Sequence, residues 1–313
     1  MNRQEATDSV LEAGKAALEA VQVLAKNPKE PLIHITDGAG LIGILQKKAL
    51  WATRASCMND ASEMVYGRKL GRSIVAERLA HNPNSRFETI WKRALAMFDG
   101  TPPLPAGTQI RIDAFVCSFC SRADTSVHWL HYGRSGRGYA LAVDFGGVDL
   151  RDWSLVPVVY YRAEQHRILS GIYDRVEERA AAVADNLNGE TDIDILAFVE
   201  LTASRMIADV TSIVAPCYKD PCFKAEEEWR LYRCLYEGEH VPREGRFPLL
   251  FRNQNGLIVP YTEFRLKTDA FKTVVMGHQV PEHPGRESVR LLLKEADVDL
   301  AACQIEHSEV PVR

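Results

Sequence analysis

One strand-like segment constrains the fold of this chain more than any other. Residues 226–236 read E-E-E-W-R-L-Y-R-C-L-Y. Successive residues of a strand point to opposite faces. One face therefore carries Trp229 and Leu231, and the other carries polar groups: Glu226, Glu228, Arg230 and Tyr232. Such a strand packs its apolar face on a core, so its polar face belongs to a solvated edge or to a polar cleft.

Strand and helix patterns alternate along the rest of the chain. Alternating or β-branched runs predict strands at 32–36, 50–52, 111–120, 138–145, 156–161, 261–267, 270–276 and 303–307. Helical spacing predicts helices around 41–45, at 61–98 with a break near 82–84, and at 127–133, 165–215 and 285–296. These elements predict an α/β (α+β) fold whose mixed central sheets form a cleft, with a helical insertion at about 165–215.

The first 30 residues form a separate element in this interpretation. Residues 6–27 place apolar side chains at helical spacing, and Asn27-Pro28 should end the helix. We therefore expect an amphipathic N-terminal helix within 1–30, followed by a single domain over 31–313. The helix either packs on this domain or makes a homodimer contact.

Composition bounds the class of protein. The 313-residue chain has a formal net charge of −4, which does not support binding of nucleic acid by bulk charge. It has no apolar run near the roughly 18 residues that a membrane helix needs, and no secretory signal pattern. Its seven cysteines are scattered, which is typical of a reduced protein. We therefore expect a cytoplasmic protein without a membrane partner.

Two candidate sites lie in the first quarter of the chain. His34 and Thr36 share a strand face opposite two isoleucines, which suits a cleft wall, although a buried structural histidine fits the same pattern. Asn59, Asp60 and Glu63 lie in and after a loop, and the last two have the spacing of a helix capping box. The two interpretations of this loop are compatible, because a helix N-terminus also binds anions.

Pairs of cysteines and histidines in the middle of the chain raise the question of a metal. Cys117 and Cys120 are three residues apart on a predicted strand, so their thiols point to opposite faces. His128 and His131 have helical i, i+3 spacing, but no third ligand is evident. We therefore expect no metal.

Three further candidate residues lie in the middle of the chain: Ser118, Trp129 and Tyr132. Ser118 lies near the end of an apolar strand. Trp129 and Tyr132 are also i, i+3, so they form either an aromatic wall of a cleft or part of the core.

The polar face of the 226–236 strand suits the stabilisation of a cation. Glu226 and Glu228 repel each other when both face one cleft, so we expect the charge of one to raise the pKa of the other. Arg230 favours the ionised form of Glu228. An ionised carboxylate held in a cleft stabilises a developing positive charge, such as the oxocarbenium-like transition state of glycosyl transfer.

The order of these motifs resembles that of the bacterial domain-of-unknown-function family 2971. The stretches that carry the resemblance are H-I-T (34–36), L-I-G-I-L (41–45), M-N-D-A-S-E (58–63), C-S-F-C-S (117–121), W-L-H-Y (129–132), Gly138, E-E-E-W-R (226–230), M-G (276–277) and S-E-V-P-V-R (308–313). Ala61 replaces the proline of the family's loop. The match covers about 31–313.

The resemblance implies an ADP-ribosyltransferase-like fold and activity, because the family opens like ADP-ribosyltransferases, which include toxins that modify DNA. It implies a toxin or phage-defence effector that transfers ADP-ribose from NAD to a nucleic acid or protein. It places His34 on a ribose hydroxyl of NAD with Thr36 beside it. It assigns the nicotinamide pocket to one of four residues: Ser118, Trp129, Tyr132 or Tyr139.

The resemblance also implies roles for the two carboxylates. Glu228 hydrogen-bonds the nicotinamide ribose and stabilises the oxocarbenium ion, while Glu226 orients or deprotonates the acceptor. Two alternatives remain open. One is a non-enzymatic module that binds a nucleotide or partner, with Glu228 closed off by a salt bridge to Arg230 or another base. The other is a metal-dependent hydrolase or nuclease whose ligands converge on one ion: Asp60, Glu63, His128 and His131.

Overall fold

The computed structural model describes residues 24–58, 62–81, 85–100, 112–122, 124–186, 193–236, 248–254 and 256–311, together with the single positions 5 and 8. Its strands are β1 (Leu32–Thr36), β2 (Ala49–Arg54), β3 (Ile112–Cys120), β4 (Tyr139–Val143), β5 (Ser154–Pro157), β6 (Glu228–Tyr236), β7 (Leu250–Gln254), β8 (Leu257–Arg265), β9 (Phe271–Met276) and β10 (Gln304–His307). Its longer helices are α2 (Gly38–Lys47), α3 (Ser62–His81), α4 (Glu88–Phe98), α5 (Ser126–His131), α6 (Arg162–Asp185), α7 (Ile193–Val214) and α8 (Glu282–Glu295). The predicted mixed α/β class is confirmed.

The strands form one open sheet of mixed direction. Its order is β10-β9-β4-β1-β3-β2-β8-β7, and β6 pairs with β3 on one side and with β5 on the other. Strand β10 runs parallel to β9, while the remaining pairs are antiparallel. The charged strand β6 is therefore flanked on both sides, so the solvated-edge interpretation is wrong.

Strand β3 is where the sheet divides. One edge of β3 pairs with β6 along its whole length, from Ile112 to Cys120. The opposite edge pairs with β2 at Phe115 and Val116, but with β1 only at Cys120. Residues 117–119 of that edge therefore lie between β1 and β2, and side chains of all three strands line a cleft here.

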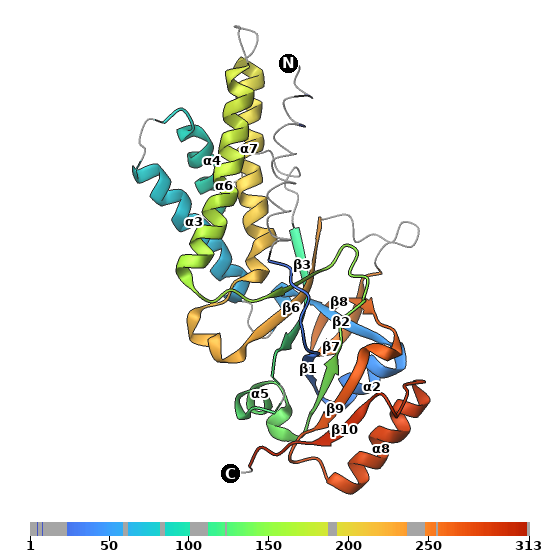
Figure 1. Cartoon of the computed structure of the whole chain (residues 1–313). Helices are drawn as coiled ribbons and strands as arrows, with labels where there is room; N and C mark the ends of the chain where they lie inside the picture. The colour runs from blue at the N-terminus through green and yellow to red at the C-terminus, as the bar shows by residue number, and fades with distance from the viewer. Residues whose placement is uncertain are drawn as a thin grey trace.

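Helices cover the two faces of the sheet. Helices α3, α4, α6 and α7 form a bundle at one end of the molecule, while α2 and α8 lie beside the strands at the other end (Figure 1). Each face of the sheet packs in its own hydrophobic core, and β3 contributes to both. Its residues Ala114 and Val116 pack in the core of the bundle, whereas Phe115 and Phe119 pack in the core that includes α2 and α8. The predicted helical insertion is thus α6 and α7, which pack with α3 and α4.

Local sequence explains how α2 is placed next to the cleft. The Asp37 side chain accepts a hydrogen bond from the Gly40 backbone N–H at 2.9 Å, which caps the helix N-terminus. Leu41, Ile44 and Leu45 are buried on one face of the helix, as their spacing predicts. Position 40 requires glycine, because a Cβ there would overlap the Thr36 hydroxyl.

Several element boundaries differ from the sequence predictions. Strand β7 (Leu250–Gln254) was missed, because its alternation is short and its neighbours are polar. Strand β6 begins at Glu228 rather than at 226, since Glu227 has a left-handed backbone (φ 44°) that ends a preceding 3₁₀ helix, Pro221–Glu226. The predicted N-terminal helix lies almost wholly outside the described residues.

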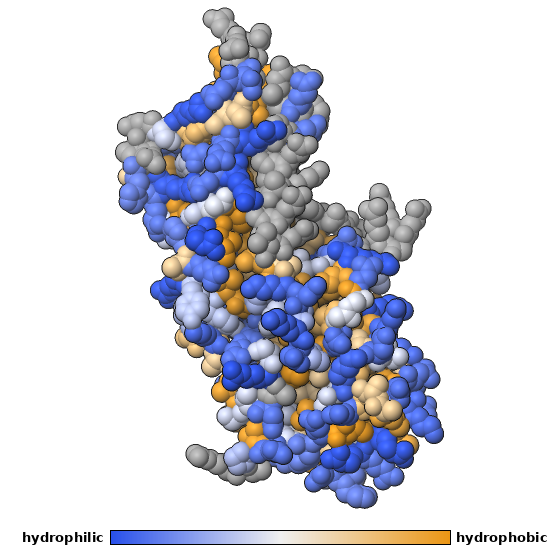
Figure 2. Space-filling view, viewed as in Figure 1, coloured by the Kyte–Doolittle hydropathy of each residue, from blue (hydrophilic) through white to orange (hydrophobic). Residues whose placement is uncertain are grey.

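The molecular surface is mostly polar over the sheet end of the face shown in Figure 2, and hydrophobic side chains are visible along the middle of the bundle. None of the helices in the described ranges is both long and apolar enough to cross a membrane.

Candidate functional site

A cleft of about 730 Å³ opens where β1 and β2 diverge from β3. It gathers six of the residues that the resemblance places at an NAD site: His34, Thr36, Ser118, Tyr132, Glu226 and Glu228. These residues are far apart in sequence and come from β1, β3, the position after α5, the 3₁₀ helix Pro221–Glu226 and the start of β6. A second, more open groove of about 440 Å³ lies by α8 and β10 and contains none of them.

His34 is held at the cleft wall by the unpaired edge of β3. Its Nδ1 lies 2.9 Å from the Ser118 backbone oxygen. A carbonyl oxygen only accepts hydrogen bonds, so Nδ1 carries the hydrogen. Burial lowers the pKa of His34, and the charge of Arg252 lowers it further. The ring is therefore neutral at pH 7, which leaves Nε2 as a hydrogen-bond acceptor.

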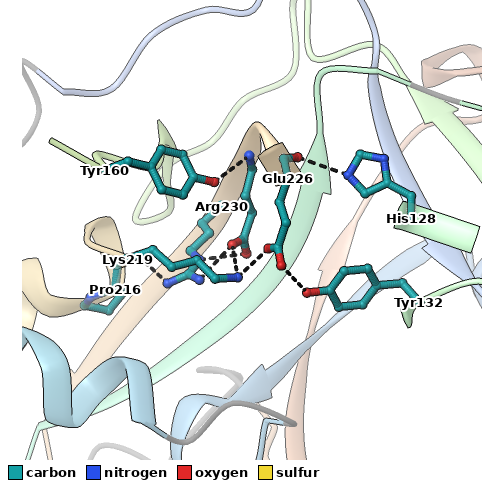
Figure 3. A network of polar contacts seen from close by, with 8 residues as sticks. His128, Tyr132, Tyr160, Pro216, Lys219, Glu226 and Arg230 are labelled. Atoms are coloured by element: carbon teal, nitrogen blue, oxygen red, sulfur yellow. Dashed lines mark hydrogen bonds and ion pairs between the residues drawn. The ribbon is translucent and has the colours of Figure 1, made fainter. Parts of the chain in front are cut away.

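Glu228 forms buried ion pairs with Lys219 and Arg230, and Figure 3 shows these two cations within the surrounding network of polar contacts. Arg230 donates to it through Nε (2.8 Å) and Nη2 (2.9 Å), and Lys219 Nζ donates at 3.0 Å. Burial alone would raise the pKa of Glu228, but the charge and hydrogen bonds of Arg230, the charge of Lys219 and a Ser118 hydrogen bond lower it to about 2. Glu228 is therefore an ionised carboxylate at all physiological pH values.

Among the residues of β6, Glu228 lines the cleft, and the buried cations Arg230 and Lys219 lie next to it. Arg230 is only 1 % exposed, and its remaining Nη1 donates to the Pro216 carbonyl oxygen at 2.9 Å. On the other face of the strand, Leu231 packs in the core that includes α2 and α8. The alternation predicted for Glu228, Arg230 and Leu231 is confirmed.

Glu226 joins the same network from outside the strand. Its Oε2 accepts from Lys219 Nζ at 2.5 Å, and its Oε1 accepts from the Tyr132 hydroxyl at 2.9 Å. Lys219 Nζ therefore contacts the carboxylates of both Glu226 and Glu228, and Figure 3 shows it pointing towards that of Glu226. The Glu226 backbone oxygen lies 3.1 Å from His128 Nε2, which ties α5 to this turn. The prediction that Glu226 belongs to the strand is wrong, because the turn at Glu227 intervenes, yet its carboxylate still faces the cleft.

The other two aromatic candidates, Trp129 and Tyr139, do not line the cleft. Trp129 is 1 % exposed, and its Nε1 donates to Asp124 at 2.7 Å. Tyr139 pairs with Thr36 across β1 and β4 and packs against the core that includes α2 and α8. Of the four candidates for the nicotinamide pocket, only Ser118 and Tyr132 line the cleft.

The loop candidates cannot be placed in the same way. Asn59 and Asp60 lie outside the described residues. Glu63 lies in the first turn of α3, which begins at Ser62, and its side chain is outside the described part of the structure.

The two histidines of α5 do not converge. His128 is 3 % exposed, with Nδ1 next to the Thr125 hydroxyl and Nε2 next to the Glu226 backbone oxygen. His131 is exposed, and its ring makes an edge contact with that of Tyr132, with the ring centroids 6.3 Å apart. Within the ranges that the structure describes, no three His, Cys, Asp or Glu side chains form a group that could hold a metal.

The cleft contains cations that were not identified from the sequence, among them Lys219 and Arg252. Lys219 follows the apolar segment Val214–Tyr218 at the end of α7. A lysine directly after such an apolar run was the one sequence feature that could have indicated a buried cation. Arg252 lies on the missed strand β7 and contacts Thr53 of β2 at 2.8 Å. Neither residue has a motif of its own, so only the fold brings them to the carboxylates and to His34.

Comparisons with known proteins found no matching family model, no matching curated protein and no matching solved structure. The resemblance to domain-of-unknown-function family 2971 stays a prediction.

Proposed function

We propose that the cleft binds NAD and that the chain transfers ADP-ribose from it to a nucleic-acid or protein acceptor. One observation carries this proposal. Ser118 lies next to both His34 and Glu228, because its backbone oxygen contacts His34 Nδ1 and its side chain is near enough to Glu228 to help lower the pKa of that carboxyl. The two residues expected on the NAD ribose are therefore separated by a single residue in one cleft.

The histidine suits recognition of a ribose. A neutral His34 with hydrogen on Nδ1 presents Nε2 as an acceptor for a ribose hydroxyl. Thr36, two residues along the same strand face, supplies a hydroxyl at the same cleft wall. Tyr132 places an aromatic ring and a hydroxyl next to the carboxylates.

The carboxylates suit the chemical step. When the bond between the ribose and nicotinamide breaks, its electron pair leaves with the nicotinamide nitrogen, and positive charge develops on the ribose. Glu228 is ionised and fixed by Arg230, so it stabilises that charge without reorganising. The acceptor then attacks the ribose carbon, and Glu226 accepts the proton that the acceptor loses.

A second candidate is a nucleotide-binding module without catalysis, and the ion pairs of Glu228 favour it. A carboxylate offers about four acceptor positions. Two contacts from Arg230 and one from Lys219 leave about one of them for a ribose hydroxyl. The two cations also offset the negative charge that catalysis would use.

Release of nicotinamide from NAD separates the two candidates. The purified protein is incubated with NAD and with single-stranded DNA, RNA or protein acceptors, next to Glu228→Gln and His34→Ala. Glu227→Gln is the matched control, because Glu227 is adjacent but its side chain is 42 % exposed and pairs with Arg122. The transferase predicts release by the wild type and the control, and loss of release in the other two variants. NAD binding without release under any condition would instead identify the binding module.

A further inference from the structure

Arg252 brings an additional cation into the cleft. Its guanidinium carbon lies 5.5 Å from the ring centroid of Trp51 and 5.6 Å from that of Tyr261. Its Nη2 donates to the Thr53 hydroxyl at 2.8 Å and to the Gln254 amide oxygen at 3.2 Å. Two aromatic rings and two oxygen atoms therefore fix the guanidinium at the cleft wall.

Arg252, which is half-buried, differs from the buried cations Lys219 and Arg230 because it forms no ion pair with a described carboxylate. Lys219 and Arg230 each contact a glutamate. Among the described Asp and Glu side chains, none has an oxygen within 4.0 Å of an Arg252 nitrogen. Burial lowers the pKa of Arg252 by more than nearby charges such as that of Asp37 raise it, as expected for a partly buried charge that forms no ion pair. The N–H groups of Nε and Nη1 make no hydrogen bond to a described residue.

Arg252 and the carboxylates occupy different parts of the cleft. Arg252 reaches β2 at Thr53, which pairs with Val116 of β3, whereas Glu228 pairs with Cys120 across the other edge of β3. Two strand spacings across the sheet and four residues along β3 separate these positions, which is on the order of 15 Å at the backbone. This separation suits an elongated ligand whose anionic group lies away from the carboxylates.

We propose that Arg252 binds the diphosphate of a nucleotide whose ribose lies at the carboxylate end of the cleft. The planar N–H groups of a guanidinium match the geometry of phosphate oxygens, and the ligand then supplies the missing counter-charge. The other arginine of the cleft, Arg134, is already paired with Asp37 at 3.0 Å. The identity of the nucleotide rests on the proposed function, but the contact with phosphate does not require catalysis.

Isothermal titration calorimetry with ADP-ribose, ADP, pyrophosphate and adenosine tests this assignment. Arg252→Gln weakens binding of ADP-ribose about ten- to a hundredfold, because a charge-assisted contact is lost, and it leaves adenosine binding unchanged. Arg265→Gln is the matched control, since Arg265 is exposed on the neighbouring strand β8 and does not line the cleft. Arg252→Lys keeps the charge but not the planar geometry, so it gives an intermediate affinity and serves if Arg252→Gln does not fold.

Two results would overturn the assignment. One is equal affinity of wild type and Arg252→Gln for ADP-ribose. The other is failure of the wild type to bind any of the three phosphate compounds. If ADP-ribose binds through Arg252 but nicotinamide is never released from NAD, the phosphate site stands and the transferase proposal fails. If NAD is cleaved with the same KM by wild type and Arg252→Gln, the transferase stands and the phosphate site is wrong.

Discussion

The buried Glu228 network predicts a specific loss of stability in acid. Arg230 and Lys219 hold the pKa of Glu228 at about 2, against 4.5 for the free side chain. Because the folded pKa lies below the unfolded one, the stabilisation is fully present above about pH 4.5 and is lost as the pH falls towards 2. The difference between 4.5 and 2, at about 1.36 kcal/mol per pH unit, corresponds to about 3 kcal/mol.

Glu228→Gln removes this contribution while keeping the shape of the side chain. At pH 7 we expect it to lower the free energy of unfolding by about 3 kcal/mol, because Arg230 loses its buried carboxylate. Urea unfolding followed by circular dichroism between pH 3 and pH 8 measures the difference from wild type, which should shrink below pH 4.5. The exposed control Glu227→Gln should cost less than about 1 kcal/mol at every pH. A Glu228→Gln protein as stable as wild type, or a difference independent of pH, would refute the reasoning.

Three further predictions concern individual side chains and glycines. Gly136→Ala should lower Tm more than Gly147→Ala. Both positions have positive φ (85° and 78°), but only at position 136 would a Cβ overlap a neighbouring histidine ring. Equal losses of Tm would contradict this. Tyr132→Phe should cost about 1 kcal/mol by thermal unfolding, since a carboxylate loses a hydrogen bond; an unchanged Tm would speak against that contact. Iodoacetamide at pH 8 should label the exposed Cys222 but not the buried Cys117, because burial raises the pKa of the Cys117 thiol to about 12. Mass spectrometry measures the labelling, and a labelled Cys117 in the native protein would contradict its burial.

Sequence periodicity predicted most of the strands and helices that position the site. The alternation over Glu228, Arg230 and Leu231 identified both a core face and a polar face, because successive strand residues point to opposite faces of the sheet and Leu231 packs in a core. The same rule failed at Glu226. Alternation assumes continuous extended backbone, and the left-handed turn at Glu227 breaks it.

The composition of the cleft was less predictable than its walls. Lys219 comes from the end of α7 and Arg252 from β7, so their meeting with β1 and β6 depends on the sheet order rather than on local sequence. Spacing alone also did not predict which of two aromatic residues is buried. Trp129 and Tyr132 are three residues apart on the same short segment, yet Trp129 lies in the core and Tyr132 in the cleft.

A crystal structure with a non-cleavable NAD analogue tests the central claim most directly. The account predicts that the nicotinamide ribose lies in the cleft, with hydroxyls at hydrogen-bond distance from His34 Nε2 and from the carboxylate of Glu226 or Glu228. An analogue bound away from His34, or outside the cleft while Glu228 keeps all its contacts with Arg230 and Lys219, would contradict it.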